Sequence, residues 1–273
     1  MCRFRLGIAC IFLAVAPATF AAYWVIDFEG AASDYVVRRG GAEIPLEKLM
    51  VLDSGDVLII RSEAGTITLV DQANTRHILT AGDPPFVVPD SEPLPGLLSN
   101  IREWVRSWWN TRGNQTTRTT AAVSKGDLDP VITGTVNREP MLLAGTRRLY
   151  VAWNGGIAPF ELRLVSASGQ VLVELFDIHQ SSIRMPEVSL QPGVYSLQIS
   201  AGGARNELTL SAVPEEHLPD TAREILAVDI PEDVRRSYLA LFLSTEDAWR
   251  FEALQLAYEH DLWQLVDRLE NER

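Results

Sequence analysis

Cysteine is nearly absent from this chain of 273 residues, which has two, Cys2 and Cys10. Both lie within the first 22 residues. Beyond that segment the chain can form no disulfide, use no thiolate nucleophile and hold no zinc through thiolates. If such a chain is exported, the lack of cysteine is more typical of a bacterial periplasm than of a eukaryotic secretory route, where small domains usually carry disulfides.

Basic residues are scarce as well. The sequence has 24 Lys and Arg against 36 Asp and Glu, a net charge of −12. Without Arg3 and Arg5 the net charge becomes −14. Because nucleic-acid binding depends on neutralising phosphates with Lys and Arg, this balance predicts no nucleic-acid partner. It also disfavours broad adhesion to anionic lipid.

Motifs for catalysis and metal binding are missing too. The histidines His77, His179, His217 and His260 stand in separate segments, and no His-x-x-x-His or Gly-x-Ser-x-Gly pattern occurs. We therefore predict no catalytic, cofactor-binding or metal-ligating residues and no cofactor. A dispersed carboxylate site remains an alternative, built from the residues Glu43, Asp53, Asp56 and Asp71, although Asp beside Gly55 is expected simply because Asp stabilises turns.

Long hydrophobic runs are lacking except at the start. Arg3 and Arg5 precede an apolar run over 6–16, which Pro17 ends before the small residues of 18–22. This order is typical of a secretory signal peptide over residues 1–22. The run is short for a membrane span, which takes about 20 residues, but 6–26 would reach that length as an uncleaved anchor. We expect a periplasmic or secreted protein, tethered to the inner membrane if the signal is not cleaved.

Residues 23–89 contain short β-rich runs between Gly, Asp and Asn clusters, which predicts a small β domain. The stretches 35–40 (YVVRRG), 52–58 (LDSGDVL) and 66–71 (TITLVD) resemble the FecR-type periplasmic β domain. The resemblance covers about 30–85. It departs from the family where Gln72 replaces the usual Gly, and no cytoplasmic segment precedes the signal. It implies a periplasmic β fold for interaction or sensing, without iron-transport signalling.

Residues 90–127 form a different kind of segment. Apolar residues recur at helical spacing over 97–109, and 110–127 is rich in Asn, Thr, Gly and Ser, so we predict an amphipathic helix followed by a flexible linker. The helix either docks onto a β domain or leaves an apolar patch for a partner or a membrane interface. Its interaction candidates are Trp104, Trp108, Trp109, Arg102 and Arg106.

Residues 128–213 predict a second β domain. Seven candidate strands lie at 130–136, 148–153, 160–166, 170–176, 183–189, 194–200 and 206–213. This spacing is typical of a β-sandwich. The segments 149–160 (LYVAWNGGIAPF) and 190–197 (LQPGVYSL) are similar to the immunoglobulin-like (Ig-like) sandwiches of bacterial envelope proteins, which implies core or corner positions for Trp153 and Tyr195.

Residues 214–273 change to helical spacing, with 15 acidic and six basic side chains. We expect Pro231 at the first position of one helix and Ser244 as the N-cap of the next, with Trp249, Leu254 and Leu256 in the core. This acidic helical region either caps the sandwich or offers an acidic face to a basic partner.

The predicted fold class is mainly β with a helical C-terminus: a small FecR-like β domain, an Ig-like β-sandwich and a short α-helical tail. The modular layout favours a non-enzymatic envelope protein that acts as an interaction scaffold or sensor-accessory protein with an envelope protein partner. Peripheral membrane contact would run through 97–109. One alternative is a glycan- or peptidoglycan-binding module that uses Trp104, Trp108, Trp153 and Tyr195. The second is an enzyme with the dispersed carboxylates.

Overall fold

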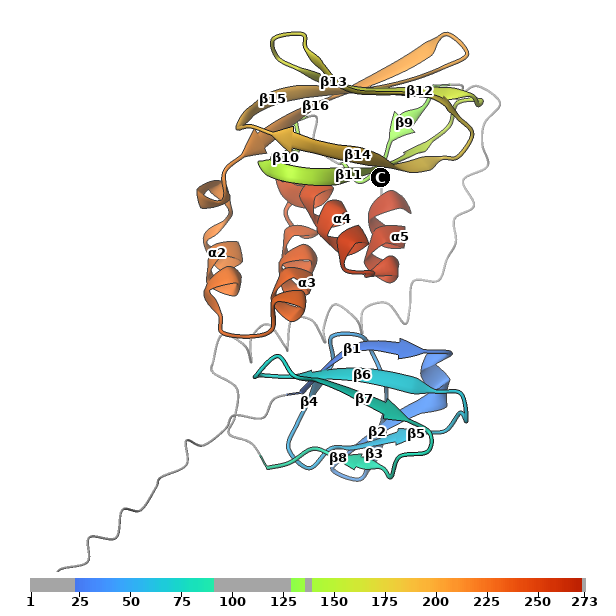
Figure 1. The fold of residues 1–273 in the computed structure, drawn as a ribbon, viewed down its shortest axis with the longest axis vertical. Coiled ribbons are helices and arrows are strands. Elements are labelled where there is room, and N and C mark those ends of the chain that lie inside the picture. The colour runs from blue at the N-terminus through green and yellow to red at the C-terminus, as the bar shows by residue number, and fades with distance from the viewer. Residues whose placement is uncertain (1–22, 91–128, 136–138, 272–273) are drawn as a thin grey trace, which may run out of the picture.

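A computed structural model describes residues 23–90, 129–135 and 139–271 of the chain. Within them, two mainly antiparallel β structures are separated in space by the C-terminal helices (Figure 1). The predicted class, mainly β with a sandwich and a helical C-terminus, is confirmed. The described residues include no helix that is both long and apolar enough to cross a membrane.

The N-terminal β domain consists of two four-stranded sheets, ordered β4-β1-β6-β7 and β3-β2-β5-β8. Strand β6 shows the alternation most clearly: Ile67 and Leu69 are fully buried, while Thr66 and Thr68 are partly exposed. This period of two is what turns one face of each sheet toward a shared core. The strands are β1 (Tyr23–Glu29), β2 (Tyr35–Arg39), β3 (Ala42–Pro45), β4 (Val51–Leu52), β5 (Val57–Ile60), β6 (Thr66–Asp71), β7 (Arg76–Thr80) and β8 (Phe86–Val87), with a 3₁₀ turn η1 (Ala32–Asp34).

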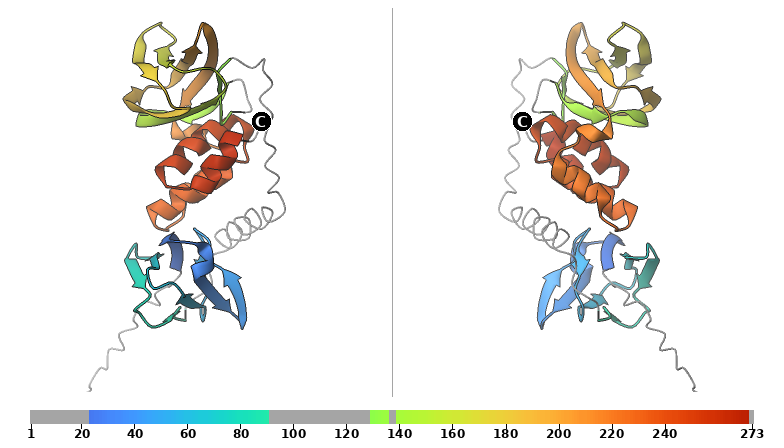
Figure 2. Two further views of the ribbon diagram at one scale, coloured as in Figure 1. Left: turned by 90° about the vertical axis from the view of Figure 1, so that its right-hand side faces the viewer. Right: turned by 90° about the vertical axis from the view of Figure 1, so that its left-hand side faces the viewer.

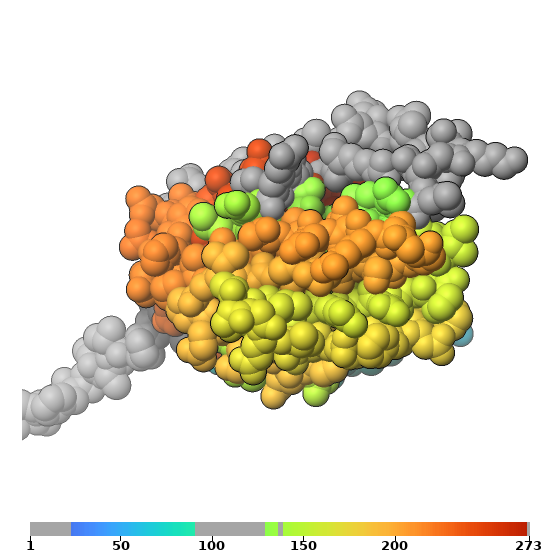
Figure 3. Space-filling view, turned by 90° about the horizontal axis from the view of Figure 1, so that it is seen from above, coloured from blue at the N-terminus to red at the C-terminus, as the bar shows by residue number. Residues whose placement is uncertain are grey.

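The second β structure is a sandwich of a five-stranded sheet, β10-β16-β15-β12-β13, and a three-stranded sheet, β14-β11-β9. Seen from above, the strands coloured yellow-green to orange form the face turned away from the helices (Figure 3). The strands are β9 (Val131–Ile132), β10 (Met141–Leu143), β11 (Gly145–Asn154), β12 (Phe160–Ser166), β13 (Val171–Ile178), β14 (Ser182–Leu190), β15 (Gly193–Ala201) and β16 (Ala204–Val213).

Two details of the sandwich differ from the sequence prediction. The strand expected at 130–136 has only two residues, because the chain turns at Gly134 (φ 76°). A Cβ there would lie 2.6 Å from Leu254 Cδ2, so glycine lets the backbone pass directly over a helix. The structure also adds β10, which pairs parallel with β16 and was not predicted. Three residues are too few to show a period of their own.

The C-terminal region contains four α-helices and two 3₁₀ turns: η3 (Glu215–His217), α2 (Asp220–Ala227), α3 (Glu232–Leu243), η4 (Asp247–Trp249), α4 (Arg250–Glu259) and α5 (Trp263–Asn271). Pro231 is the N-cap of α3 rather than its first residue. Ser244 is not an N-cap: it ends α3, with its Oγ donating to the Leu241 carbonyl at 2.6 Å. The predicted core residues Trp249, Leu254 and Leu256 are buried.

These helices are a central layer rather than a tail (Figures 1 and 2). One hydrophobic core joins helical residues to Trp24, Leu49 and Val51 of the N-terminal domain and to Tyr150 and Ala152 of the sandwich. Helix α4 is buried on all sides over 251–257. A helix surrounded in this way packs against several partners at once, so α4 is the element around which the other parts assemble.

Trp24 connects the N-terminal domain to the helical layer. Its side chain is fully buried, and its Nε1–H donates to the Tyr238 hydroxyl oxygen at 3.1 Å. The Tyr238 hydroxyl donates in turn to the Leu49 carbonyl at 3.4 Å. An ion pair between Arg76 and Asp233 (2.7 Å) lies at the rim of the same contact. Trp24 and its hydrogen bonds are therefore the buried centre of a contact that Leu49 and Val51 extend.

We expect Trp24→Ala to weaken this docking by about 3–5 kcal/mol, because it removes a large buried side chain and a hydrogen-bond donor. The neighbours Tyr23 and Val25 belong to the separate core of the N-terminal domain, which should stay folded. Calorimetry should then show the N-terminal domain unfolding in its own transition. Val87→Ala, at a 57% exposed position, is the control. A single transition no lower than that of the control would contradict the prediction.

Candidate binding surface

The interaction candidates Trp104, Trp108, Trp109, Arg102 and Arg106 lie outside the described residues, so their role stays a prediction. The same holds for the signal peptide over 1–22 and for the membrane contact through 97–109. The structure does place the other candidates.

Asp53 and Asp56 come together, but around a cation. Arg39 pairs with Asp53 at 2.9 Å and with the buried carboxylate of Asp56 through both Nε and Nη2. Asp56 also accepts the backbone N–H of Asp53 at 2.7 Å. The hydrogen bond to Asp56 raises the pKa of Arg39 despite its partial burial. This arrangement stabilises a turn. Because Arg39 neutralises both carboxylates, they are not a pair suited to general acid–base catalysis.

Glu43 and Asp71 lie elsewhere in the domain with partners of their own. Hydrogen bonds from Arg38 and Arg61 lower the pKa of the exposed Glu43. Burial alone would raise the pKa of Asp71, but hydrogen bonds from His77 (2.9 Å) and the Thr75 N–H (2.8 Å) lower it overall. Each carboxylate therefore stabilises a local strand or turn.

Within the described ranges, no group of three or more His, Cys, Asp or Glu side chains could hold a metal ion. His77 pairs with Asp71, and the exposed His179 pairs with Asp177 at 3.0 Å. These are local pairs within one strand or hairpin, as their spacing along the chain suggests.

Trp153 and Tyr195 are buried, which corrects their assignment to a glycan-binding surface of the sandwich. Trp153 is 1% exposed and packs edge-on against Phe160 in the sandwich core. The hydroxyl of Tyr195 donates to the Gln191 carbonyl four residues upstream at 2.8 Å, as in a tyrosine corner. The positions implied by the sandwich resemblance, core and corner, are those observed.

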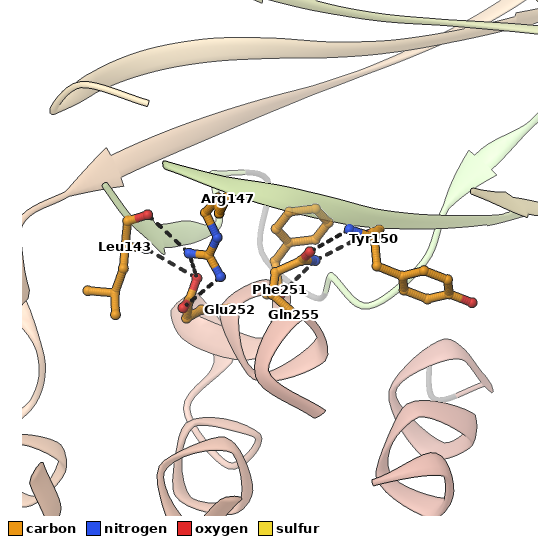
Figure 4. A network of polar contacts seen from close by, with 6 residues as sticks. All are labelled: Leu143, Arg147, Tyr150, Phe251, Glu252 and Gln255. Atoms are coloured by element: carbon orange, nitrogen blue, oxygen red, sulfur yellow. Dashed lines mark hydrogen bonds and ion pairs between the residues drawn. The ribbon is translucent and has the colours of Figure 1, made fainter. Parts of the chain in front are cut away.

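A buried polar network joins α4 to the sandwich (Figure 4). The Arg147 guanidinium, on β11, binds both carboxylate oxygens of Glu252, at 2.7 and 3.1 Å. Glu252 is 1% exposed and also accepts the Leu143 N–H, while Arg147 donates to the Leu143 carbonyl. Bidentate pairing satisfies both charges inside the protein. It also satisfies the N–H and the carbonyl of Leu143, the last residue of the short edge strand β10.

Gln255, one turn after Glu252, replaces a missing strand next to β11. Its side-chain oxygen accepts the Tyr150 N–H at 2.7 Å, and its nitrogen donates to the Tyr150 carbonyl at 3.0 Å. The β11–β14 pairing has an irregularity at this point. A helix that covers a sheet edge with matching donors and acceptors satisfies backbone groups that would otherwise be buried unpaired. Phe251 on the same helix enters the sandwich core.

The same junction carries an aromatic ladder, defined as the side chains of Tyr150, Tyr258 and Trp263. Tyr150 and Tyr258 stack at 4.0 Å between ring centroids, and Trp263 meets Tyr258 edge-on at 5.4 Å. Arg184, from β14, lies over the Tyr258 ring at 5.8 Å. The Glu270 carboxylate accepts the Tyr150 hydroxyl at 2.6 Å. Residues from β11, β14, α4 and α5 therefore meet on one surface.

The ladder runs from buried to exposed. Tyr150 is 8% exposed, Tyr258 is partly buried and Trp263 is 50% exposed. Burial, and next the hydrogen bond to Glu270, raises the pKa of Tyr150 to about 12. The exposed indole of Trp263 therefore lies against the edge-on ring of Tyr258, which in turn stacks on the buried Tyr150. This is the best-defined candidate binding surface of the described residues.

Sequence reasoning missed Glu252, Gln255 and the ladder. A signal for the first two was present, since they are the polar residues of the otherwise apolar run 251–257. Buried polar residues of this kind are usually paired. For Trp263 the signal was weaker: its position on α5 lies beside the apolar stripe formed by Leu262, Val266 and Leu269. The ladder itself joins residues about a hundred positions apart, which no local pattern shows.

Glu252→Leu should destabilise the protein by about 3–5 kcal/mol, because it leaves the Arg147 charge without its buried partner. The double variant Arg147→Met/Glu252→Leu should recover most of that loss in unfolding free energy. It should remain about 1–2 kcal/mol less stable than the wild type, because the Leu143 N–H loses its acceptor. Chemical denaturation of both variants and the wild type measures this. A double variant no more stable than Glu252→Leu would show that the charge pair is not what holds the junction.

The Tyr150 phenol should titrate late, with a pKa of about 12 against an ordinary value of 10.0. Since the folded state holds this proton more tightly than the unfolded chain, its contribution to stability is complete below pH 10 and is lost as the pH rises toward 12. Ultraviolet titration measures phenolate formation, and in the wild type it should show one tyrosine that ionises near pH 12. That step should move to a lower pH in Glu270→Gln and should be lost in Tyr150→Phe. Identical curves for the wild type and Tyr150→Phe would refute the assignment.

Comparison with known proteins finds a weak structural likeness and no relative by sequence. No protein-family model matches the chain, and no curated protein matches it. Among solved structures, CopC from Methylosinus trichosporium OB3b is 18% identical, covers 30% of this chain and 89% of its own, and has a TM-score of 0.23. A structure of Dpr1 IG1 bound to DIP-eta IG1 is 14% identical, covers 32% and 98%, and also scores 0.23. These neighbours are β-sandwich domains of Ig-like type.

Proposed function

We propose that this protein is a non-enzymatic interaction scaffold or sensor-accessory protein of the bacterial cell envelope, exported by its N-terminal signal. The observation that carries the proposal is the helical layer, which holds both β structures through buried contacts. Trp24 of the N-terminal domain is hydrogen-bonded to Tyr238 of α3, and Arg147 of the sandwich is paired with Glu252 of α4. A protein built in this way presents two separate β surfaces in one fixed arrangement.

Each β structure offers a sheet edge with an exposed apolar side chain. In the N-terminal domain, β7 is an edge strand, and its Ile78 is 65% exposed. In the sandwich, β13 is an edge strand, and its Phe176 is 55% exposed. Edge strands recognise extended segments of other proteins through backbone hydrogen bonds, with side-chain contacts for specificity. Such edges on a rigid body support a role in holding a protein partner.

The sequence adds three supports to the proposal. A signal over 1–22 implies export, and the FecR-type resemblance over about 30–85 implies a periplasmic β fold for interaction or sensing. The net charge of −12 favours a partner with a basic or neutral contact face over nucleic acid. The envelope location and the FecR-like identity are parts of the proposal.

In-cell photo-crosslinking tests the proposal directly. A crosslinking amino acid at Ile78 and, in a second variant, at Phe176 probes the two edges, with Glu63 in an exposed turn as the matched control position. We expect one envelope protein to be captured from both edge positions and not from Glu63. In a Trp24→Ala background, capture from Ile78 and Phe176 should no longer select the same protein, because the two domains are no longer held together.

Two results would contradict the scaffold role. One is the absence of any protein captured above the Glu63 control at either edge. The other is a reproducible hydrolase or transferase activity of the purified protein that a single substitution abolishes.

A further inference from the structure

Trp263 is the exception among the described tryptophans. Trp24, Trp153 and Trp249 are 0%, 1% and 4% exposed, whereas Trp263 is 50% exposed. Helix α5 buries Leu265, Val266 and Leu269 without it. An indole that is held in place by a neighbouring ring, yet half exposed, is not explained by packing of the helix, because exposure of so large an apolar surface is unfavourable.

A hydrogen-bond donor, Arg184, and a hydrogen-bond acceptor, Glu270, lie along the same ladder. Trp263 and Glu270 are seven residues apart on α5, so they lie on one side of the helix with a separation of about 10 Å along its axis. Tyr258 and Tyr150 connect them from the neighbouring elements, and the exposed Arg184 lies over Tyr258. The accessible part of the ladder is therefore the half-exposed indole of Trp263 and the partly buried Tyr258, with the Arg184 guanidinium and the Glu270 carboxylate along the ladder, while Tyr150 is the buried support.

We propose that the aromatic ladder with Arg184 and Glu270 is a carbohydrate-binding strip for a linear chain of pyranose sugars, with Trp263 as its stacking platform. A pyranose ring has a face of C–H groups that packs against the electron-rich face of an indole. Its hydroxyls both donate and accept hydrogen bonds, so they need acceptors and donors at the rim. Glu270 supplies the acceptor, because the Tyr150 hydroxyl occupies one of several lone-pair sites on its carboxylate. The Arg184 guanidinium supplies the donor.

Other ligand classes fit the strip less well. A cation would need the open space of an aromatic cage, but Tyr150 and Tyr258 already stack on each other at 4.0 Å, and Arg184 already lies over Tyr258. A proline-rich peptide needs a groove between aromatic walls, and the same stacking closes that groove. Anionic lipid is disfavoured because residues 214–273 carry 15 acidic against six basic side chains. This inference goes beyond the scaffold role and does not depend on it.

Saturation-transfer NMR and calorimetric titration of the full mature protein test the proposal with three probes: a chitotetraose, a cellotetraose and a mannotetraose. We expect one of them to bind with a Kd of about 1 mM or tighter, as suits an open surface. Magnetisation should transfer mainly to C–H protons of one sugar face. Trp263→Ala should weaken binding at least about tenfold, and Trp263→Phe should restore part of it. Ile157→Ala, at a 67% exposed apolar position between β11 and β12, is the control and should bind as the wild type does.

The remaining outcomes would overturn the proposal. They are no binding of any of the three oligosaccharides up to about 10 mM, equal binding by the wild type and Trp263→Ala, or an equal loss in Ile157→Ala. Binding of a proline-rich decapeptide that Trp263→Ala abolishes, without sugar binding, would assign the strip to a peptide. Circular dichroism of each variant confirms that the fold is retained, and crosslinking from Ile78 and Phe176 reports the scaffold role separately.

Discussion

The backbone of an exposed sheet edge has to find hydrogen-bond partners when another element covers it, and this constraint shapes the centre of the molecule. Helix α4 covers the sandwich at the point where β11 and the short strand β10 have unpaired groups. Gln255 pairs with both backbone groups of Tyr150, and Glu252 with Arg147 satisfies those of Leu143. Without these side chains, burial of the edge would leave polar groups unpaired at about 1–3 kcal/mol each. The helix could then not lie where it does.

Because α4 is fixed to the sandwich, the rest of the helical layer has a fixed position from which to contact the N-terminal domain. Helix α3 packs beside α4 and presents Tyr238 to Trp24. Helix α5 packs on the other part of α4 and presents Trp263 to Tyr258. The anchoring of one domain and the formation of the aromatic ladder therefore both follow from the position of α4. A strongly acidic region can serve as this central layer because its charges lie mostly outside, while 251–257 is buried.

Much of the fold could be predicted from the sequence, because strands and helices have local signatures. Alternation in 66–70 predicted β6, and the Gly-rich turns at 155–156 and 202–203 predicted where strands of the sandwich end. Local patterns failed where a contact from far along the chain decided the outcome. Helix α4 limits the strand at 131–132, since Gly134 passes over Leu254, and β10 exists because β16 lies beside it. Trp153 and Tyr195 were correctly expected in core or corner positions, which removes them from any binding surface.

By itself, the sequence determined the class of the protein: mainly β, with a helical C-terminus, acidic, and without cysteine after residue 22. It determined these because composition, period and turn residues act over a few positions of the chain. Only the tertiary structure decided which polar residues are structural and which face solvent. Asp53 and Asp56 surround Arg39, Glu252 is buried against Arg147, and Trp263 is left half exposed. The physical reason is that burial and pairing depend on residues up to about two hundred positions away, such as Trp24 and Tyr238, which the chain brings together only when it folds.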